Sequence, residues 1–286
     1  MFEGLKRKSI GQRITYILVS LLFAVFAFSY LYILFWMIMS ATKTHTEIIL
    51  NPFKLPEVWH WEHFIEAMSV FEVNGTGFWM MLFNSIWFSV VPIIINHYTT
   101  STFAYTCTMY KFPTSNWAFF IVTLMMTLPI YGTGGSMYRI LWNLGLINNY
   151  ASIIFAVGGF SVHFLYYQAF FKNMSPAYRE SASMDGANDF QIWFKVYLPQ
   201  AKPILFALGI TSWIAEWNDY SNHMINNPKL PTLPVGIYQF NTEMIYRARL
   251  DILFTACFIV CIPTIILFIA FNKVITTSVS FGGLKG

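Results

Sequence analysis

The chain has 286 residues, of which 56% are hydrophobic, 19% aromatic and only 10% charged, and its formal net charge is +4. This balance excludes an ordinary soluble domain, in which about 25% of residues are charged. No basic run alternates with aromatic residues, so we expect no nucleic-acid partner. The three cysteines lie in apolar stretches, and we interpret them as packing residues rather than a disulfide or metal site.

The N-terminal segment, residues 1–13, is short and basic, with Lys6, Arg7 and Lys8 in succession. We expect it to lie on the cytoplasmic surface of the membrane. The apolar stretch that follows is about twice as long as the core of a signal peptide, so it predicts a membrane span.

Six stretches have the composition of membrane-spanning helices, which need about 20 predominantly apolar residues. They are residues 14–42, 73–110, 112–138, 140–171, 201–226 and 252–272. The second is long enough for one tilted helix or for a hairpin of two. One helix, with the N-terminus inside, places eleven of the 17 Lys and Arg residues on the cytoplasmic side. We therefore predict an all-α membrane protein with six spans and both termini inside.

Two shorter features interrupt this pattern. Residues 43–72 form an external loop in which 62–71 predict one short helix. The third span contains Pro129 and a glycine-rich stretch at 132–135, which predict a break in the helix. Broken spans often line a substrate path, and Tyr131 and Tyr138 lie beside this one. The alternative is a bundle helix that simply kinks.

Residues 173–203 have the pattern of a soluble helical hairpin within a lipid-like chain. Ser175-Pro176 predicts a helix start, and Asp185-Gly186 predicts its end. Asn188 or Asp189 starts a second helix, with an aromatic stripe and a final proline. The stripe consists of Phe190, Trp193, Phe194 and Tyr197, and the proline is Pro199. Such a segment predicts a docking site for a partner; the alternative is an interfacial helix without one.

The same residues resemble a known family. Glu180-Ser181-Ala182, followed by Asp185-Gly186-Ala187, is similar to the cytoplasmic loop by which permease subunits of bacterial ABC importers contact their ATPases. Ser181 stands where the family usually has alanine. The segments Glu216–Tyr220 and Pro231–Ile237, with the tail Gly282-Gly283-Leu284-Lys285-Gly286, resemble the smaller permease subunit of carbohydrate importers, the group containing the maltose permease.

This resemblance implies the type I importer permease fold, with residues 14–286 forming a single permease domain in the inner membrane of a bacterial cell. Its cytoplasmic coupling loop would be residues 173–203, and its external loop residues 227–246. Residues expected to contact the ATPase are Glu180, Ala182, Asp185, Gly186, Ala187, Phe190, Phe194 and Pro199. Residues expected to contact an extracellular binding protein are Pro231, Thr232, Leu233, Pro234 and Gly236. The implied partners are a homologous second permease, two ATPase subunits, the binding protein, a carbohydrate and membrane lipid.

A substrate path is predicted along the fifth span. Glu216 and Asp219 are ionisable groups on one helix face, and such groups in a span are functional candidates. Amide and aromatic residues beside them suit a sugar. The predicted path residues are Tyr131, Tyr138, Trp213, Glu216, Trp217, Asn218, Asp219 and Tyr220. The alternative is that the acidic pair lies at the outer interface and holds the external loop.

The chain has no Gly-x-x-x-x-Gly-Lys-Ser/Thr motif and no convincing hydrolytic or metal-ligating pattern. We therefore expect no catalytic residue, no metal and no bound cofactor, with ATP and Mg²⁺ held by the ATPase subunits. The predicted function is inward transport of a carbohydrate, an oligosaccharide above all. The alternatives are an ABC permease for a peptide, amino acid or polyamine and, from another class, an intramembrane enzyme or structural scaffold.

Overall fold

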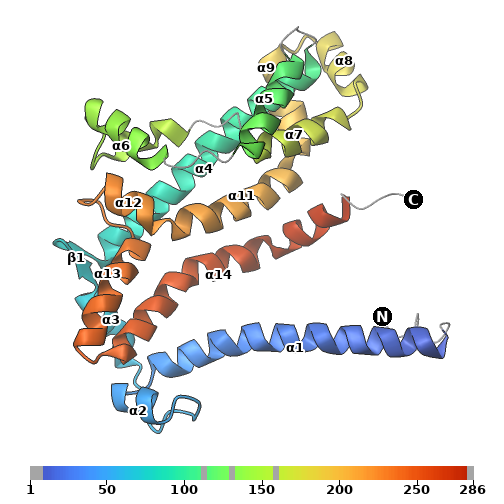
Figure 1. The fold of residues 1–286 in the computed structure, drawn as a ribbon. Helices are drawn as coiled ribbons and strands as arrows, with labels where there is room; N and C mark the ends of the chain where they lie inside the picture. Colours follow the sequence, from blue (N-terminus) through green and yellow to red (C-terminus); the bar gives the residue numbers. More distant parts are fainter. Residues whose placement is uncertain (1–8, 111–114, 129–132, 157–160, 282–286) are drawn as a thin grey trace. The chain divides into compact units, whose positions relative to one another are not determined.

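The computed structural model describes residues 9–110, 115–128, 133–156 and 161–281, and the chain there is mostly helical (Figure 1). Contacts divide it into two units, Met1–Phe71 with Phe240–Ile259, and Glu72–Gln239 with Val260–Gly286. The first unit begins with α1 (Ile10–Ala41), α2 (His45–Leu50) and α3 (Glu62–Val70). The second contains β1 (Glu72–Val73), β2 (Thr76–Gly77), α4 (Phe78–Met109), α5 (Ser115–Thr127), α6 (Thr133–Asn143), η2 (Tyr150–Ala156), α7 (Val162–Lys172), α8 (Ala177–Met184), α9 (Asp189–Ile192), η3 (Trp193–Tyr197), α10 (Leu198–Gln200), α11 (Lys202–Asn218) and α12 (Tyr220–Asn226). Both units share α13 (Leu233–Tyr246) and α14 (Leu250–Phe281).

Three described helices are long and apolar enough to cross a membrane: α1, α4 and the 250–272 part of α14. They coincide with three of the six expected spans. The single-helix interpretation of residues 73–110 is confirmed, because α4 runs for 32 residues with Pro92 inside it. The short helix expected at 62–71 is also present, as α3.

The other three expected spans are not continuous helices in the structure. The 112–138 stretch divides into α5, which ends at Thr127, and α6, which begins at Thr133; the predicted break at 129–132 lies outside the described residues. The 140–171 stretch, expected as one continuous spanning helix, is divided among α6, η2 and α7. There, Gly145 and Asn148 adopt left-handed backbone conformations between α6 and η2, which ends helical continuity. Apolar composition alone does not reveal the left-handed residues that end a helix inside an apolar stretch.

The fifth stretch, 201–226, divides at Asp219. Its carboxylate accepts a hydrogen bond from the backbone N–H of Asn222 at 3.0 Å and so caps α12. The side chain therefore starts a new helix immediately after α11, rather than continuing the old one. The result is a 17-residue α11 followed by a separate seven-residue helix.

In the first unit, polar groups join the end of α1 to α3 and the start of α14. Arg249 forms ion pairs with Glu66 at 2.8 Å and with Asp251 at 3.1 Å. Hydrogen bonding to Glu66, then to Asp251, raises the pKa of Arg249, so it stays charged. The Ala41 carbonyl accepts hydrogen bonds from Thr255 and from the ring of His63. By contrast, α1 leaves its apolar side chains exposed from Ile10 to Phe35.

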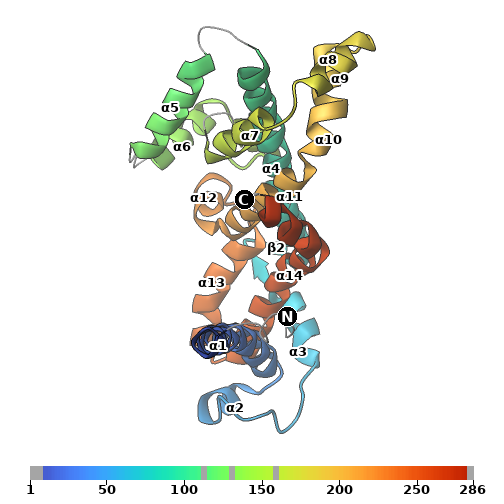
Figure 2. The ribbon, with the colours of Figure 1, turned by 90° about the vertical axis from the view of Figure 1, so that its right-hand side faces the viewer.

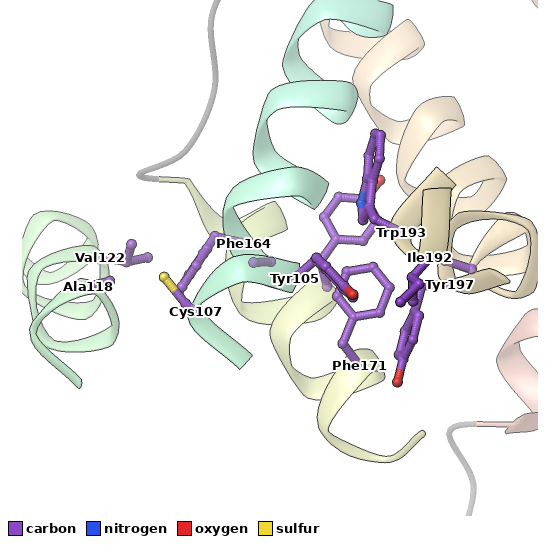
Figure 3. Close-up of a cluster of buried hydrophobic side chains, with 12 residues drawn as sticks. Tyr105, Cys107, Ala118, Val122, Phe164, Phe171, Ile192, Trp193 and Tyr197 are labelled. Atoms are coloured by element: carbon purple, nitrogen blue, oxygen red, sulfur yellow. The ribbon is translucent and has the colours of Figure 1, made fainter. Parts of the chain in front are cut away.

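The second unit is built around α4, which packs against α7 and α11 (Figure 2). A buried cluster forms near the C-terminal end of α4, where aromatic side chains from α7 and η3 meet Tyr105 (Figure 3). Its members are Ala104, Tyr105, Cys107, Ala118, Val122, Phe164, Tyr167, Phe171, Ile192, Trp193, Tyr197 and Ala201. The two ends of α4 carry different structures: α8 and α9 lie at its C-terminal end, and the β1–β2 hairpin and α12 lie toward its N-terminal end (Figure 1).

Candidate functional site

The first helix of the 173–203 segment is α8, whose bounds match the predicted helix, and it ends as the sequence predicts. Gly186 has φ +81°, the left-handed conformation that glycine adopts without strain. The N–H of Gly186 donates to the Ser183 carbonyl, and the N–H of Ala187 donates to the Ala182 carbonyl. These two bonds form a Schellman cap, which turns the chain sharply. At the other end, the Ser175 hydroxyl accepts from the N–H of Ala177 at 3.3 Å.

The second helix begins at Asn188, whose side chain and that of Gln191 form a reciprocal capping box. It continues from α9 through the π-helical turn η3 into α10. Its aromatic stripe has two faces. Trp193 and Tyr197 are buried against Tyr105 and the α7 aromatics, whereas Phe190 and Phe194 are exposed and stack on each other at 5.9 Å. One face anchors the segment and the other is free for a partner.

Arg179 joins this segment to the end of α4. Its guanidinium donates to the carbonyl of Met109 at 3.0 Å and lies 4.5 Å from the centre of the Tyr110 ring. It also reaches Asp189 at 3.5 Å. A planar guanidinium suits this combination of stacking and hydrogen bonding. Sequence reasoning missed Arg179, although its position directly before Glu180 was a signal.

Most residues predicted to contact an ATPase form one exposed surface on α8–α10. The exposed ones are Glu180, Asp185, Gly186, Phe190, Phe194 and Pro199. Ala182 and Ala187 are half-buried and pack against the core cluster. A cavity of about 880 Å³ adjoins this surface between α8 and the end of α4, lined in part by Arg179, Glu180 and Met184.

The predicted substrate-path residues on α11 have different environments. Trp213 and Trp217 are buried and stacked at 4.8 Å, and Trp213 donates to the Thr264 hydroxyl, so they are packing residues. The Asn218 amide donates to the Ile214 carbonyl of its own helix. Asp219 is the cap of α12. Of the five α11–α12 residues before Tyr220 in the predicted path, Glu216 alone lines the polar cavities among the described residues.

The tyrosines of the predicted path are also separated. Tyr220 stacks on Tyr238 at 4.9 Å, and both rings are exposed, which makes a flat aromatic surface on α12 and α13. Tyr138 is half-buried on α6 and stacks on Trp142. Tyr131 lies outside the described residues.

Two adjoining polar cavities lie beside Pro92 of α4, and both are lined by Pro92, Ala156 and Glu216. The first, of about 190 Å³, is completed by residues of α4, α6, η2 and α12: Phe88, Met137, Leu141, Ser152, Ile153, Phe155, Asn222, His223, Asn226 and Asn227. The second, of about 410 Å³, is completed by Ile93, Asn96, Ser161, Val162, His163, Thr211, Ser212 and Ala215. Of these polar groups, Glu216 alone belongs to the predicted substrate path, and sequence reasoning missed those of α12. The spacing of 222, 223, 226 and 227, which forms one polar helix face, was the available signal.

A polar contact joins three helices next to the second cavity. The ring of His97 on α4 is hydrogen-bonded to the Tyr167 hydroxyl at 2.7 Å and to the Ser212 hydroxyl at 3.1 Å. It also lies 4.9 Å from the ring of His163. A lone histidine in a predicted span is typical of a packing or pore-lining group. His97 links α4, α7 and α11, while His163 lines the cavity.

The 227–246 segment is mostly helical rather than a loop, because α13 begins at Leu233. Of its five predicted binding-protein contacts, Pro231, Thr232, Leu233 and Gly236 are buried, and Pro234 is half-buried. Ser85 of α4 accepts the Leu233 N–H at 2.7 Å, and Asn84 donates to the Pro231 carbonyl at 2.9 Å. The exposed residues nearby are Pro228, Lys229 and Tyr238. The predicted residues therefore hold the segment to α4, and their neighbours form its surface.

The family model described as binding-protein-dependent transport system inner membrane component matches residues 98–281. The chain belongs to this family. It is accordingly an ABC transporter permease of the inner membrane, and its family implies ATPase and binding-protein partners. Among the described residues, no group of three or more His, Cys, Asp or Glu side chains is arranged to hold a metal ion.

Named relatives extend over nearly the whole permease. The diacetylchitobiose uptake system permease protein NgcG of Streptomyces coelicolor is 25% identical over 87% of this chain and 82% of its own. The arabinooligosaccharides transport system permease protein AraQ of Halalkalibacterium halodurans is 25% identical over 92% of this chain and 94% of its own. A solved structure, a bacterial ABC transporter that imports the acidic polysaccharide alginate, has the same fold. One of its chains matches with a TM-score of 0.74 and 22% identity, covering 93% of this chain and 98% of that chain.

Proposed function

We propose that this permease moves a carbohydrate, an oligosaccharide in particular, into the cell by ATP-driven alternating access. The protein would work beside a second, homologous permease, with two ATPase subunits inside and an extracellular binding protein that delivers the sugar. It would itself catalyse no reaction, and ATP and Mg²⁺ would be bound by the ATPases. The observation that carries this proposal is the construction of the 173–203 segment.

That segment has the properties of a mechanical lever. Its first helix, α8, is polar and exposed, so a partner has a surface to bind. Its second helix is fixed by Trp193 and Tyr197 in the core between α4 and α7. Since close-packed interiors transmit displacement instead of absorbing it, movement of α8 would tilt the membrane helices. ATP binding on the partners would thereby change the substrate cavity of the transporter from inward-facing to outward-facing.

The proposed topology has six spans with both termini inside. The long helices α1, α4 and α14 would each be one span, and the shorter α5–α6, α7 and α11 regions would provide the remaining three. This arrangement puts α8 and Lys172, Arg179, Lys195 and Lys202 on the cytoplasmic side, in accord with the positive-inside rule. The exposed apolar surface of α1 would be covered by lipid or by the second permease.

The carbohydrate assignment is supported by the relatives, whose names specify diacetylchitobiose and arabinooligosaccharides. It is also supported by the two polar cavities beside Pro92, which lack Lys and Arg among their described lining residues, since hydroxyl-rich ligands require several hydrogen-bonding groups. A peptide, amino acid or polyamine would be the substrate in the competing proposal. No observation on the described residues favours an intramembrane enzyme or a scaffold.

The deciding experiment measures ATP hydrolysis by the co-expressed permease–ATPase complex in lipid nanodiscs. The binding protein is added empty or loaded from a glycan panel, alongside peptide and polyamine controls. Stimulation by a loaded glycan supports both the importer and its substrate class. Stimulation by a peptide or polyamine alone overturns the carbohydrate assignment, and failure of any ATPase to co-purify overturns the lever.

A further inference from the structure

The smaller of the two cavities beside Pro92 contains buried polar atoms that the protein leaves without partners. His223, Asn226 and Asn227 are only 7%, 6% and 4% exposed. In the described part of the chain, His223 Nδ1, Asn226 Oδ1 and Asn227 Oδ1 make no hydrogen bond. An unsatisfied buried polar atom destabilises the folded protein, and three in one cavity are unusual in a structural core.

The helix that carries these residues is itself well ordered by other groups. Asp219 caps α12, and the Asn226 amide nitrogen donates to Asn222, which fixes the orientation of its free oxygen. The N–H of Asn148 donates to the Asn226 carbonyl at 3.0 Å. The free side-chain atoms are thus held in place by bonds elsewhere, which is how a preorganised binding site is built.

Apolar side chains also line this cavity. Phe88 of α4 lies 4.9 Å from the His223 ring, and Leu141 and Ile153 are among the other apolar lining residues. A sugar ring has hydroxyls at its edge and C–H groups on its faces, and this combination of apolar and polar lining groups matches it. The volume of about 190 Å³ is below the roughly 300–1,000 Å³ of drug-sized pockets, so it suits one small ring at a time.

The charges around the cavity limit the kind of ring it accepts. Its one ionisable acid is Glu216, and no Lys or Arg is among its described lining residues. The undescribed stretches 129–132 and 157–160 contain no Lys or Arg in sequence either. An anionic sugar would bring its charge into a site without a cation, which is costly in a poorly hydrated region. The same holds for the larger cavity, which shares Glu216.

We propose that the cavity formed by Glu216, His223, Asn226 and Asn227 is a binding subsite on this chain for one uncharged sugar unit, and that it rejects units bearing a carboxylate. This inference rests on the proposed function and specifies its substrate class. It contrasts with the acidic polysaccharide carried by the transporter of similar fold. Glu216 lines both cavities, so its carboxyl group would accept hydrogen bonds from sugar hydroxyls in either one as the sugar moves between them.

The test measures sugar binding directly, without the binding protein. Saturation-transfer NMR on the permease–ATPase complex in nanodiscs would compare three probes: diacetylchitobiose, an arabinose trisaccharide and an alginate trisaccharide. We expect at least one neutral probe to bind and the alginate probe not to bind. Equal or stronger binding of the alginate probe overturns the charge rejection, and binding by none of the three overturns the subsite.

Variants locate the binding. Asn226→Leu keeps the branched shape of the side chain but removes the free oxygen and the amide nitrogen that bonds to Asn222, and it should weaken binding of the neutral probe about tenfold. Asn173→Leu, an exposed asparagine at the end of α7, is the matched control and should bind as the wild type does. If Asn226→Leu does not assemble, Asn226→Ser shortens the same side chain with less disturbance. Wild-type binding by an assembled Asn226 variant shows that the cavity holds water only and overturns the proposal.

The two proposals fail separately. Absence of glycan-stimulated ATP hydrolysis, with neutral-probe binding that depends on Asn226, contradicts the importer proposal and leaves the subsite. Stimulated hydrolysis with probe binding that is indifferent to Asn226 contradicts the subsite and leaves the importer. A Glu216→Gln variant should weaken neutral-probe binding without admitting the alginate probe, because it adds no cation. Alginate binding by that variant would contradict the explanation based on a missing cation.

Discussion

The segments at the two ends of α4 share the residue types of turns and aromatic contacts but have opposite exposure. Residues 175–199 expose a polar helix and bury two aromatic anchors, Trp193 and Tyr197. Residues 219–239 bury their proline-rich stretch, where Ser85 and Asn84 bind the backbone, and expose a tyrosine pair. Both contain prolines, a glycine and aromatic residues. These residue types mark a structured segment, but they do not determine which of its faces is available to a partner.

The largest expected effect concerns the buried anchor of the first segment. Trp193→Ala should destabilise the permease by about 3–5 kcal/mol, because a large fully buried side chain leaves a cavity between α4 and η3. Phe194→Ala, which removes the adjacent exposed ring, should leave stability nearly unchanged and weaken ATPase association. Thermal unfolding and co-purification of the complex measure the two quantities. Equal destabilisation by both variants would break the distinction between the two faces.

The turn between the two helices comes next. Gly186→Val should cost about 1–2 kcal/mol or more, because a β-branched residue resists the left-handed conformation. An added Cβ meets nothing within 4 Å, so the expected cost comes from backbone strain. We expect sugar transport per ATP to fall, whereas Gly186→Asn, which tolerates this conformation, should be close to wild type. Normal ATP-driven uptake by the valine variant would count against the lever.

In the second segment, Ser85→Ala should destabilise by about 1–3 kcal/mol. The variant leaves the buried N–H of Leu233 without its acceptor. Ser69→Ala is the control, since that exposed hydroxyl bonds only to its own helix at Glu66. Hydrogen exchange of the 228–236 backbone is the measurement. Unchanged protection in Ser85→Ala would show that this segment is held by packing instead.

Arg179 provides a smaller effect that separates coupling from stability. Arg179→Lys should lose the stacked, forked contact with Tyr110 and Met109, worth roughly 0.5–1.5 kcal/mol. We expect binding-protein-stimulated ATP hydrolysis to fall several-fold while the complex still assembles. Replacement of an exposed base outside both segments, as in Lys54→Arg, should change neither quantity. If the binding protein stimulates ATP hydrolysis by the Arg179→Lys complex as much as by the wild type, the end of α4 is not part of the lever.

The smallest effect on stability is expected at the exposed tyrosine pair. Tyr238→Ala should cost at most about 0.5–1.5 kcal/mol, because its partner Tyr220 also faces outward. If this surface contacts the binding protein, the concentration of loaded binding protein needed for half-maximal ATP hydrolysis should rise. Tyr246→Phe, at the exposed end of α13, is the control. If that concentration does not change, the tyrosine pair does not contact the binding protein, and other exposed residues of the segment, such as Lys229, would form the contact.

The amino-acid sequence by itself determined the local features whose cause is local. The start of α9 at Asn188 follows from capping chemistry, the end of α8 at Gly186 from left-handed glycine, and the unbroken α4 from the distribution of Lys and Arg. The membrane class and the family resemblance at Glu180–Ala187 were equally readable, because they rest on composition and on a contiguous motif.

Only the tertiary structure decided which side chains share a cavity or a core. Trp213 and Trp217 looked like a sugar platform but stack inside the bundle, while His223 and Asn226 went unnoticed and line a cavity with Glu216. Pro231 and Leu233 looked exposed and are buried by bonds from α4, more than 140 residues away in sequence. The physical reason is that burial depends on what another helix places opposite a residue, and no local pattern contains that information.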